Sequence, residues 1–517
     1  AGPAGPAPAA PPPCGLPLLG PLPRPLAPPV RWAIPRDKDE RDPYEVPNAL
    51  RSDNFVIRWG PDLLDATSID ALSADLEDAW EDQIVAMEHP APPTTDSTLM
   101  NVYVGDSGGG APPGAGTGGY FTPDEQGFPM LVISMESLLD PTWRRVVALH
   151  EFYHSVQWGL DTYPYEGVSA WYWEATASWI PSYSDPQSTA HGAFLWGFAL
   201  EPEHALDAFD YPDEGTLAEY HQYGAFIFPT FVAEQVADWT VVRDTWVAPA
   251  GGTQDPIEAN RAALAARGLD FDLVFADFAA HNVFWDYAQG ATWESYVAWG
   301  QDLYPGSDPV SLRATATGLA QGPPNGRRPR RYGSNIVLLP PSPDPLDLRV
   351  ELDQQGSEGS APTWALTLVR RDGAITYEAL PAAGPATTLT VEQGGDLALS
   401  VVVWADERGG DESFRYTVRI AEPEDGDDDD DDDDDDDWGG GDGCADDGCG
   451  CHAAPPTGSG EAGALLQPGR LAAVLLLVTA ACLRWAGTAT ALSRLQLALA
   501  AVAGMSSCRT PADHSAS

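Results

Sequence analysis

The stretch of sequence that decides the fold runs from residue 140 to residue 160 and reads DPTWRRVVALHEFYHSVQWGL. Asp140 can cap a helix, Pro141 suits its first turn, and Gly159 suits its exit. The stretch therefore predicts one long helix, and the pattern HExxH lies in its middle.

The HExxH pattern occupies residues 150–154. Helical positions four apart lie about 5–6 Å from each other between Cβ atoms, so His150 and His154 share one face. Two imidazoles so placed can bind one Zn²⁺ ion, while Glu151 reaches a water on the metal. The helical context favours this interpretation over a chance occurrence of the pattern.

A zinc site needs a third protein ligand and an open fourth position. The extended pattern HExxHxxGxxH is excluded, because the chain has Gln157 and Leu160 where it needs glycine and histidine. The favoured third ligand is Glu174, which lies in the aromatic-rich stretch WYWEATASW, with nineteen residues between it and His154. Glu166 is the alternative ligand, in a predicted loop.

The flanking sequence predicts an α+β domain around this helix. Alternating or continuous apolar runs predict strands at residues 54–59, 99–104 and 130–135. Apolar residues at helical spacing predict a helix over residues 68–88, and a second helix is expected to start near residue 168 and to end at Pro181. Further helical stretches follow, and short β-rich runs after residue 335 predict a small all-β sandwich.

These patterns divide the chain into six segments. The expected segments are a Pro/Ala-rich disordered leader (1–40), a domain that holds the HExxH helix (41–321), a linker (322–334), a β-sandwich accessory domain (335–421), an acidic spacer with a Cys motif (422–463) and an apolar C-terminal region (464–517).

The site residues resemble those of the gluzincin metallopeptidases, in which HExxH is followed on a second helix by a glutamate at this spacing. The resemblance implies a zincin-like catalytic domain, a mixed sheet with active-site helices and then a helical subdomain. It also implies a zinc-dependent endopeptidase that hydrolyses a protein or peptide substrate by a metal-activated water. In this family scheme His150, His154 and Glu174 bind the metal and Glu151 is the general base.

The same resemblance implies a further donor for the oxyanion. The segment EYHQYGAFIFPTFVAEQ (219–235) resembles the aminopeptidase-type stretch that carries a tyrosine in this role, and here the matching position holds His221. Tyr223 is the second candidate. Thermolysin-like enzymes also carry an aspartate four residues after the ligand glutamate, where this chain has Ser178.

Two other functions share these residues. The chain could be a catalytically inactive, metalloprotease-like surface binding or adhesion protein, although the intact set His150, Glu151, His154 and Glu174 argues against decay. A metal-dependent hydrolase of a non-peptide bond is a third option.

The net charge of −50 excludes whole classes of partner. Binding of nucleic acid, or docking of a basic patch on anionic lipid, needs clustered cations. Seventeen acidic residues and no basic residue lie between Glu422 and Asp447, eleven of them in the run Asp427–Asp437. Like charges in such a run repel, which predicts an extended spacer. The run lacks the spaced ligands and glycine turn of an EF-hand loop, so Ca²⁺ has no specific support.

The C-terminal region resembles a MYXO-CTERM sorting tail. It contains GCGC at residues 448–451, then the apolar stretch Leu471–Leu483 and Arg484. The resemblance implies export, processing by a C-terminal sorting protease, and either retention at the cell surface or outer membrane or release into the medium. Contact with a membrane is expected only through this tail.

Overall fold

The computed structural model describes residues 38–421, apart from residues 117, 212–214, 237, 250–253, 343, 357–358, 393 and 406–411. The segments predicted as an acidic spacer and a sorting region lie outside the described residues, as does nearly all of the predicted leader. Within the described part, no helix has both the length and the apolar character that crossing a membrane requires.

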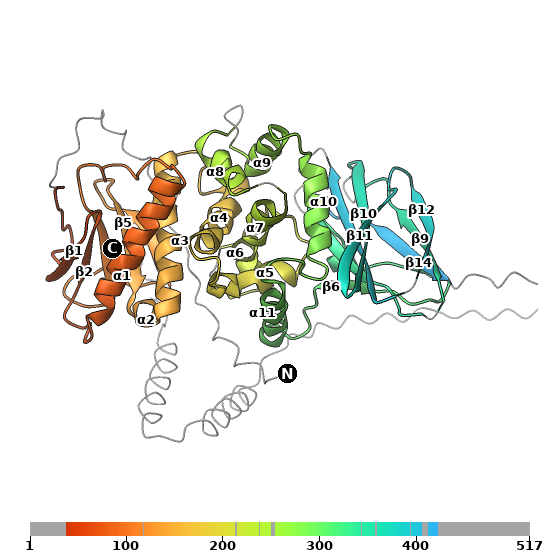
Figure 1. Ribbon diagram of the computed structural model, residues 1–517, viewed down its shortest axis with the longest axis horizontal. Coiled ribbons are helices and arrows are strands. Elements are labelled where there is room, and N and C mark those ends of the chain that lie inside the picture. The colour runs from red at the N-terminus through yellow and green to blue at the C-terminus, as the bar shows by residue number, and fades with distance from the viewer. Residues whose placement is uncertain are drawn as a thin grey trace, which may run out of the picture. The chain divides into compact units, whose positions relative to one another are not determined.

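The first sheet is mixed and has the strand order β1-β2-β3-β5-β4 (Figure 1). Strands β2, β3 and β5 are parallel, whereas β1 and β4 are antiparallel strands at the two edges. Its strands are β1 (Asn48–Arg51), β2 (Phe55–Trp59), β3 (Met100–Gly105), β4 (Gly119–Pro123) and β5 (Pro129–Ser134). The three strands expected from the sequence correspond to β2, β3 and β5, with bounds shifted by one residue.

Both faces of this sheet are covered, and every residue of β3 and β5 is buried. Helices α1 (Thr67–Trp80) and α3 (Pro141–Leu160) contribute to the core on one face. On the other face Val46, from the segment before β1, packs with Tyr103 and Val132. Burial on both faces accounts for the nearly continuous apolar sequence of the central strands.

Helix α3 is the long helix predicted around HExxH. The side chain of Asp140 accepts hydrogen bonds from two backbone N–H groups of the first turn, at 2.9 and 3.0 Å. The helix ends at Leu160, and Asp161 follows in the left-handed conformation with φ 50°. A buried ion pair of 2.8 Å between Arg144 and Asp75 joins α3 to α1. The helix is thus held firmly beside the sheet.

Helix α4 (Ala170–Ser184) does not end at Pro181, so that prediction was wrong. Proline has no N–H group, and the carbonyl of Ala177, four residues earlier, therefore loses its helical partner. The ring of His150 on α3 lies close to this carbonyl and to Ser178, with Nδ1 3.5 Å from Oγ of Ser178. The helix nevertheless continues for three residues past the proline, to Ser184.

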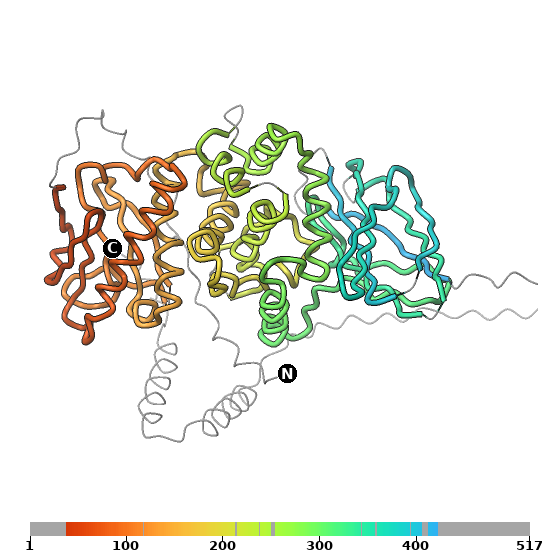
Figure 2. The backbone as a smooth tube through the Cα atoms, viewed as in Figure 1, coloured from red at the N-terminus to blue at the C-terminus, as the bar shows by residue number. Residues whose placement is uncertain are grey.

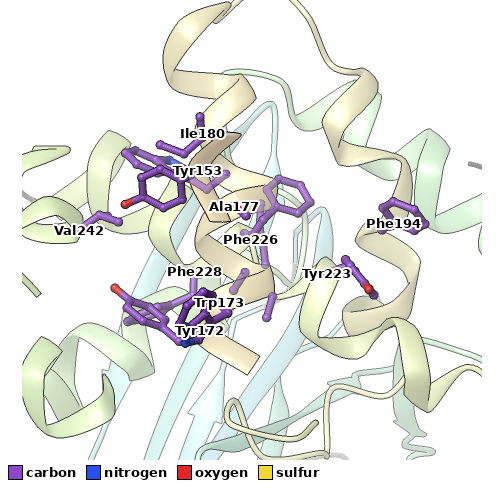
Figure 3. Close-up of a cluster of buried hydrophobic side chains, with 14 of the residues drawn as sticks. Tyr153, Tyr172, Trp173, Ala177, Ile180, Phe194, Tyr223, Phe226, Phe228 and Val242 are labelled. Atoms are coloured by element: carbon purple, nitrogen blue, oxygen red, sulfur yellow. The ribbon is translucent and has the colours of Figure 1, made fainter. Parts of the chain in front are cut away.

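The remaining helices contribute to an aromatic-rich core that also includes α3 and α4. They are α2 (Met135–Leu139), α5 (Leu195–Ala199), α6 (His221–Gly224), α7 (Ile227–Phe231), α8 (Thr240–Val247), α9 (Pro256–Ala265), α10 (Phe271–His281) and α11 (Gly290–Leu303). The backbone path through them is traced in Figure 2. Figure 3 shows part of this core, including Tyr172 and Trp173 of α4, Phe228 of α7, and Phe226 just before α7.

The C-terminal part of the described chain forms two further sheets, with the orders β11-β10-β13-β8-β6 and β12-β9-β14-β7. Their strands are β6 (Val310–Arg313), β7 (Ala320–Gln321), β8 (Gly333–Leu338), β9 (Leu346–Leu352), β10 (Pro362–Asp372), β11 (Ala374–Leu380), β12 (Ala386–Val391), β13 (Asp396–Ala405) and β14 (Tyr416–Ala421). The two sheets share one hydrophobic core, to which Leu348 and Val418 contribute from one sheet and Leu366 and Val401 from the other.

This β-rich region starts earlier than residue 335, where the sequence predicted it. Strand β6 pairs with β8, and β7 pairs with β14, so residues 310–313 and 320–321 belong to the sheets. Both strands are too short to show an alternating pattern. The segment expected as a linker is also packed, because Tyr332 is buried and its N–H donates to the carbonyl of Val403.

The sheet with the order β11-β10-β13-β8-β6 contacts the helices through the face that points away from the β-rich core. Val369 and Ala398 of this sheet form a small core with Ala280 of α10. Val402 of β13 belongs to the large core of the helical region. The helical and β-rich regions therefore share buried apolar surface.

The buried histidine His191 predicts a specific response to acid. Its side chain is 3% exposed, packs against Phe226 and Trp293, and has a pKa lowered to about 4 by burial. Below pH 6.5 the unfolded chain binds a proton at this residue that the folded chain does not bind, so stability falls as the pH drops from 6.5 towards 4.

We expect the variant His191→Phe to lose this part of the pH dependence. The fall in the free energy of unfolding between pH 7 and pH 5 should be about 2 kcal/mol smaller in the variant than in the wild type. Urea unfolding at the two pH values measures the difference, and equal pH dependence in both proteins would contradict it.

Candidate metal centre

Three donor atoms from helices α3 and α4 meet at one point of the core. Nε2 of His150 and Nε2 of His154 lie 3.0 Å apart. Oε2 of Glu174 lies 3.3 Å from the first nitrogen and 3.5 Å from the second. Ligand atoms that lie about 2.0–2.1 Å from a tetrahedral zinc ion are about 3.3 Å from one another. The three atoms therefore fit the ligand triangle of such an ion.

Glu151 belongs to the same group. One potential ligand atom each from His150, Glu151 and His154 can be chosen so that all three lie within 4.8 Å of one another. The Glu151 carboxylate lies near the backbone of Phe121 on β4, and among the described residues neither of its oxygens makes a hydrogen bond. This buried group could bind a metal ion.

Burying the two histidines and two glutamates costs free energy unless their polar atoms have hydrogen-bond partners or bind an ion. Glu151, His154 and Glu174 are fully buried and His150 is 3% exposed. Buried polar groups normally have hydrogen-bond partners, and buried charges are normally paired or bind metals. Among the described residues, Oε2 of Glu174 makes no hydrogen bond, and it lies 3.3 and 3.5 Å from the two histidine nitrogens. A bound cation would satisfy this oxygen.

The pKa values of the two carboxyl groups are shifted in opposite directions, upward for Glu151 and downward for Glu174. Burial raises the pKa of Glu151 to about 8, against the opposing effect of His154. Burial also opposes ionisation of Glu174, but His154 and His150 outweigh it and hold the pKa of Glu174 at about 2. Neighbouring carboxyl groups with pKa values pushed apart are typical of sites where one group carries charge and the other moves a proton.

Further side chains orient the three donors. Nδ1 of His154 lies 2.7 Å from Oε1 of Gln157, and Nδ1 of His150 lies 3.5 Å from Oγ of Ser178. The hydroxyl of Tyr165 donates to Oε1 of Glu174 at 2.8 Å. Sequence reasoning overlooked Gln157 and Tyr165. The spacing of Gln157, three residues after His154 on one helix, is a signal that could have found it.

The structure brings Glu174, and not Glu166, to the histidines. Glu174 lies in the second turn of α4, where the helix faces α3. Glu166 is exposed in the loop before α4, whereas Oε2 of Glu174 is buried within 3.5 Å of both histidine nitrogens.

Of the two candidates for the oxyanion donor, Tyr223 lies near the histidines. Its ring stacks on that of His150, with 6.4 Å between centroids and an interplanar angle of 27°. Figure 3 shows Tyr223 beside Phe194. Nε2 of His221 instead lies 3.1 Å from the carbonyl oxygen of Ala205, and burial lowers the pKa of His221 to about 3. Positions two apart on a helix point in different directions, so one of the two residues faces away.

Strand β4 passes beside the general-base candidate. A Cβ atom at Gly119 would lie 2.8 Å from a methyl group of Val147 and 3.0 Å from Cγ of Glu151. Glycine therefore leaves the space in which the Glu151 side chain lies, and a larger residue would displace it.

Comparison with known families places the chain in one of them. The model of the Family of unknown function (DUF6055) matches residues 31–376. This range covers more than half of the chain, and the chain belongs to that family. The range includes every residue of the metal centre. A search of curated proteins gives no match.

The geometry predicts one zinc ion per chain, held in part by Glu174. The metal-free full chain should bind one equivalent of zinc and gain thermal stability, because the ion binds the folded state only. We expect Glu174→Ala to weaken zinc binding by more than about 100-fold, which exceeds the usual effect of removing a residue that only supports a ligand. Glu166→Ala is the matched control.

Competition with a chromophoric chelator measures both affinities. Zinc affinity that falls in Glu166→Ala and stays unchanged in Glu174→Ala would show that the loop carboxylate is the ligand.

Proposed function

We propose that the protein is an exported zinc-dependent endopeptidase of gluzincin type. The observation that carries this proposal is the triangle of His150, His154 and Glu174 donors with the poorly satisfied carboxylate of Glu151 beside it. The sheet with an antiparallel edge strand next to the HExxH helix supports a zincin-like catalytic domain. The two C-terminal sheets would form a β-sandwich accessory domain.

His150, His154 and Glu174 would hold the ion. When bound, zinc polarises a carbonyl group and lowers the pKa of water in its coordination shell. Glu151 would take a proton from the attacking water and return it to the leaving amine. Tyr223, whose ring stacks on His150, is the proposed donor to the oxyanion.

The burial of the site adds a requirement. The hydroxyl of Tyr165 contacts Glu174, and its ring contacts Phe209 and Tyr211. A polypeptide can reach Glu151, which is fully buried, only if side chains around the site move. The same burial favours the second candidate function, a surface binding protein on an inactive metalloprotease-like scaffold.

Export and retention by the C-terminal tail remain part of the proposal. They rest on the resemblance of residues 448–484 to a sorting tail, which lies outside the described residues. The proposed partners are a protein or peptide substrate and a sorting protease that acts on the tail.

The variant Glu151→Gln tests the proposed mechanism. It keeps the side chain's shape and removes its ability to take a proton, so casein cleavage should fall by at least about 100-fold while zinc content stays at one per chain. Glu166→Gln, a matched change at an exposed glutamate, should retain full activity.

Unchanged casein cleavage in Glu151→Gln would overturn the mechanism. A zinc-loaded wild type that cleaves neither casein nor gelatin would favour the binding protein instead. Zinc-dependent cleavage of esters without proteolysis would point to a hydrolase of a non-peptide bond.

A further inference from the structure

We propose that Gln157 is a positioning residue that fixes the tautomer and the direction of the His154 ring through a neutral amide. This inference concerns the site of the proposed zinc peptidase and rests on that proposed function only for its biological meaning. The hydrogen bonds that carry it are independent of catalysis.

The amide group of Gln157 has one orientation. Its Nε2 atom lies 3.0 Å from the carbonyl oxygen of Trp173 and 2.9 Å from Oγ1 of Thr176. A carbonyl oxygen only accepts hydrogen bonds, so the amide nitrogen must face Trp173. The amide oxygen then faces Nδ1 of His154, at 2.7 Å.

The hydrogen bonds of the Thr176 hydroxyl also have one possible direction each. It donates to the carbonyl of Tyr172 at 2.6 Å. The indole N–H of Trp246, which can only donate, points to its oxygen at 3.2 Å. Oγ1 therefore has its own hydrogen committed to Tyr172 and receives hydrogens from Trp246 and Gln157.

This chain of hydrogen bonds determines which ring nitrogen of His154 carries the hydrogen. Because the Gln157 oxygen only accepts, Nδ1 of His154 carries a hydrogen. In the neutral ring Nε2 then has the free electron pair, and Nε2 is the atom that faces His150 and Glu174. The backbone of α4 thus prepares His154 as a ligand through two side chains, Thr176 and Gln157. The face of Trp173 stacks on the His154 ring at 6.2 Å and limits its rotation.

The neutral amide distinguishes this arrangement from a carboxylate in the same role. Metal-bound histidines usually donate their second N–H to a carboxylate, a carbonyl or water. Here Glu174 remains the only carboxylate among the three proposed ligands, and the group behind His154 adds no charge. A carboxylate at position 157 could not donate to Trp173, so its oxygens would face that carbonyl without a hydrogen.

The variant Gln157→Leu tests the assignment in the full chain. It has similar volume and no acceptor for His154, so the zinc dissociation constant should rise by about 10–100-fold. Thr176→Val should give a smaller rise, because Trp173 still holds the amide. Gln157→Glu keeps an acceptor for His154, and its zinc affinity should stay above that of Gln157→Leu.

Gln83→Leu is the matched control. Gln83 is equally buried, and its side chain donates to the backbone carbonyl of Leu149 on α3 without a hydrogen bond to any histidine ring among the described residues. Both leucine variants should lose comparable thermal stability as metal-free proteins. Only Gln157→Leu should lose zinc affinity and alter the visible absorption spectrum of the cobalt-substituted protein.

Two results would overturn the proposal. One is a zinc dissociation constant in Gln157→Leu within twofold of the wild type, with an unchanged cobalt spectrum. The other is an equal loss of zinc affinity in Gln83→Leu, which would reveal a general effect of destabilising α3. If peptide cleavage is absent in the wild type, the affinities and spectra still decide the role of Gln157.

Discussion

The structure depends on the contact between helices α3 and α4, where two imidazoles and one carboxylate face each other in the buried core. Removing an ionised carboxylate from water costs on the order of several kcal/mol even after the protein relaxes. Glu174 stays ionised because His150 and His154 lie within 3.5 Å of its oxygen. The rest of the fold keeps these two helices together. An ion pair joins α3 to α1, and aromatic side chains of α4 pack into the surrounding core.

Hydrogen bonds that cross between the two helices set the directions of the donors. Gln157 of α3 donates to the Trp173 carbonyl in the backbone of α4. Nδ1 of His150 lies 3.5 Å from Oγ of Ser178, which is also on α4.

Local patterns in the sequence predicted the parts of the molecule that depend on local physics. The capped helix with HExxH, the central strands and the position of Glu174 on the next helix all follow from periodicity and spacing. Contacts between residues that are distant in the sequence could not be predicted in this way. Pro181 was expected to end α4 because proline lacks the N–H that continues a helix, but α4 is packed against α3 and extends to Ser184. The sequence ranked His221 ahead of Tyr223, but the ring that lies beside His150 is that of Tyr223, because the directions of side chains on a four-residue helix depend on packing.

The central place of β13 in its sheet has a consequence for how the family's boundaries should be understood. The family match ends at residue 376, inside β11, whereas β13 lies between β10 and β8, both of which fall within the match. A chain cut at that boundary would separate β8 from β10 and would remove Val402 from the core of the helical region. In this protein the packed strands extend to residue 421, so the sheet that contains β8 and β10 is completed by residues beyond the family match.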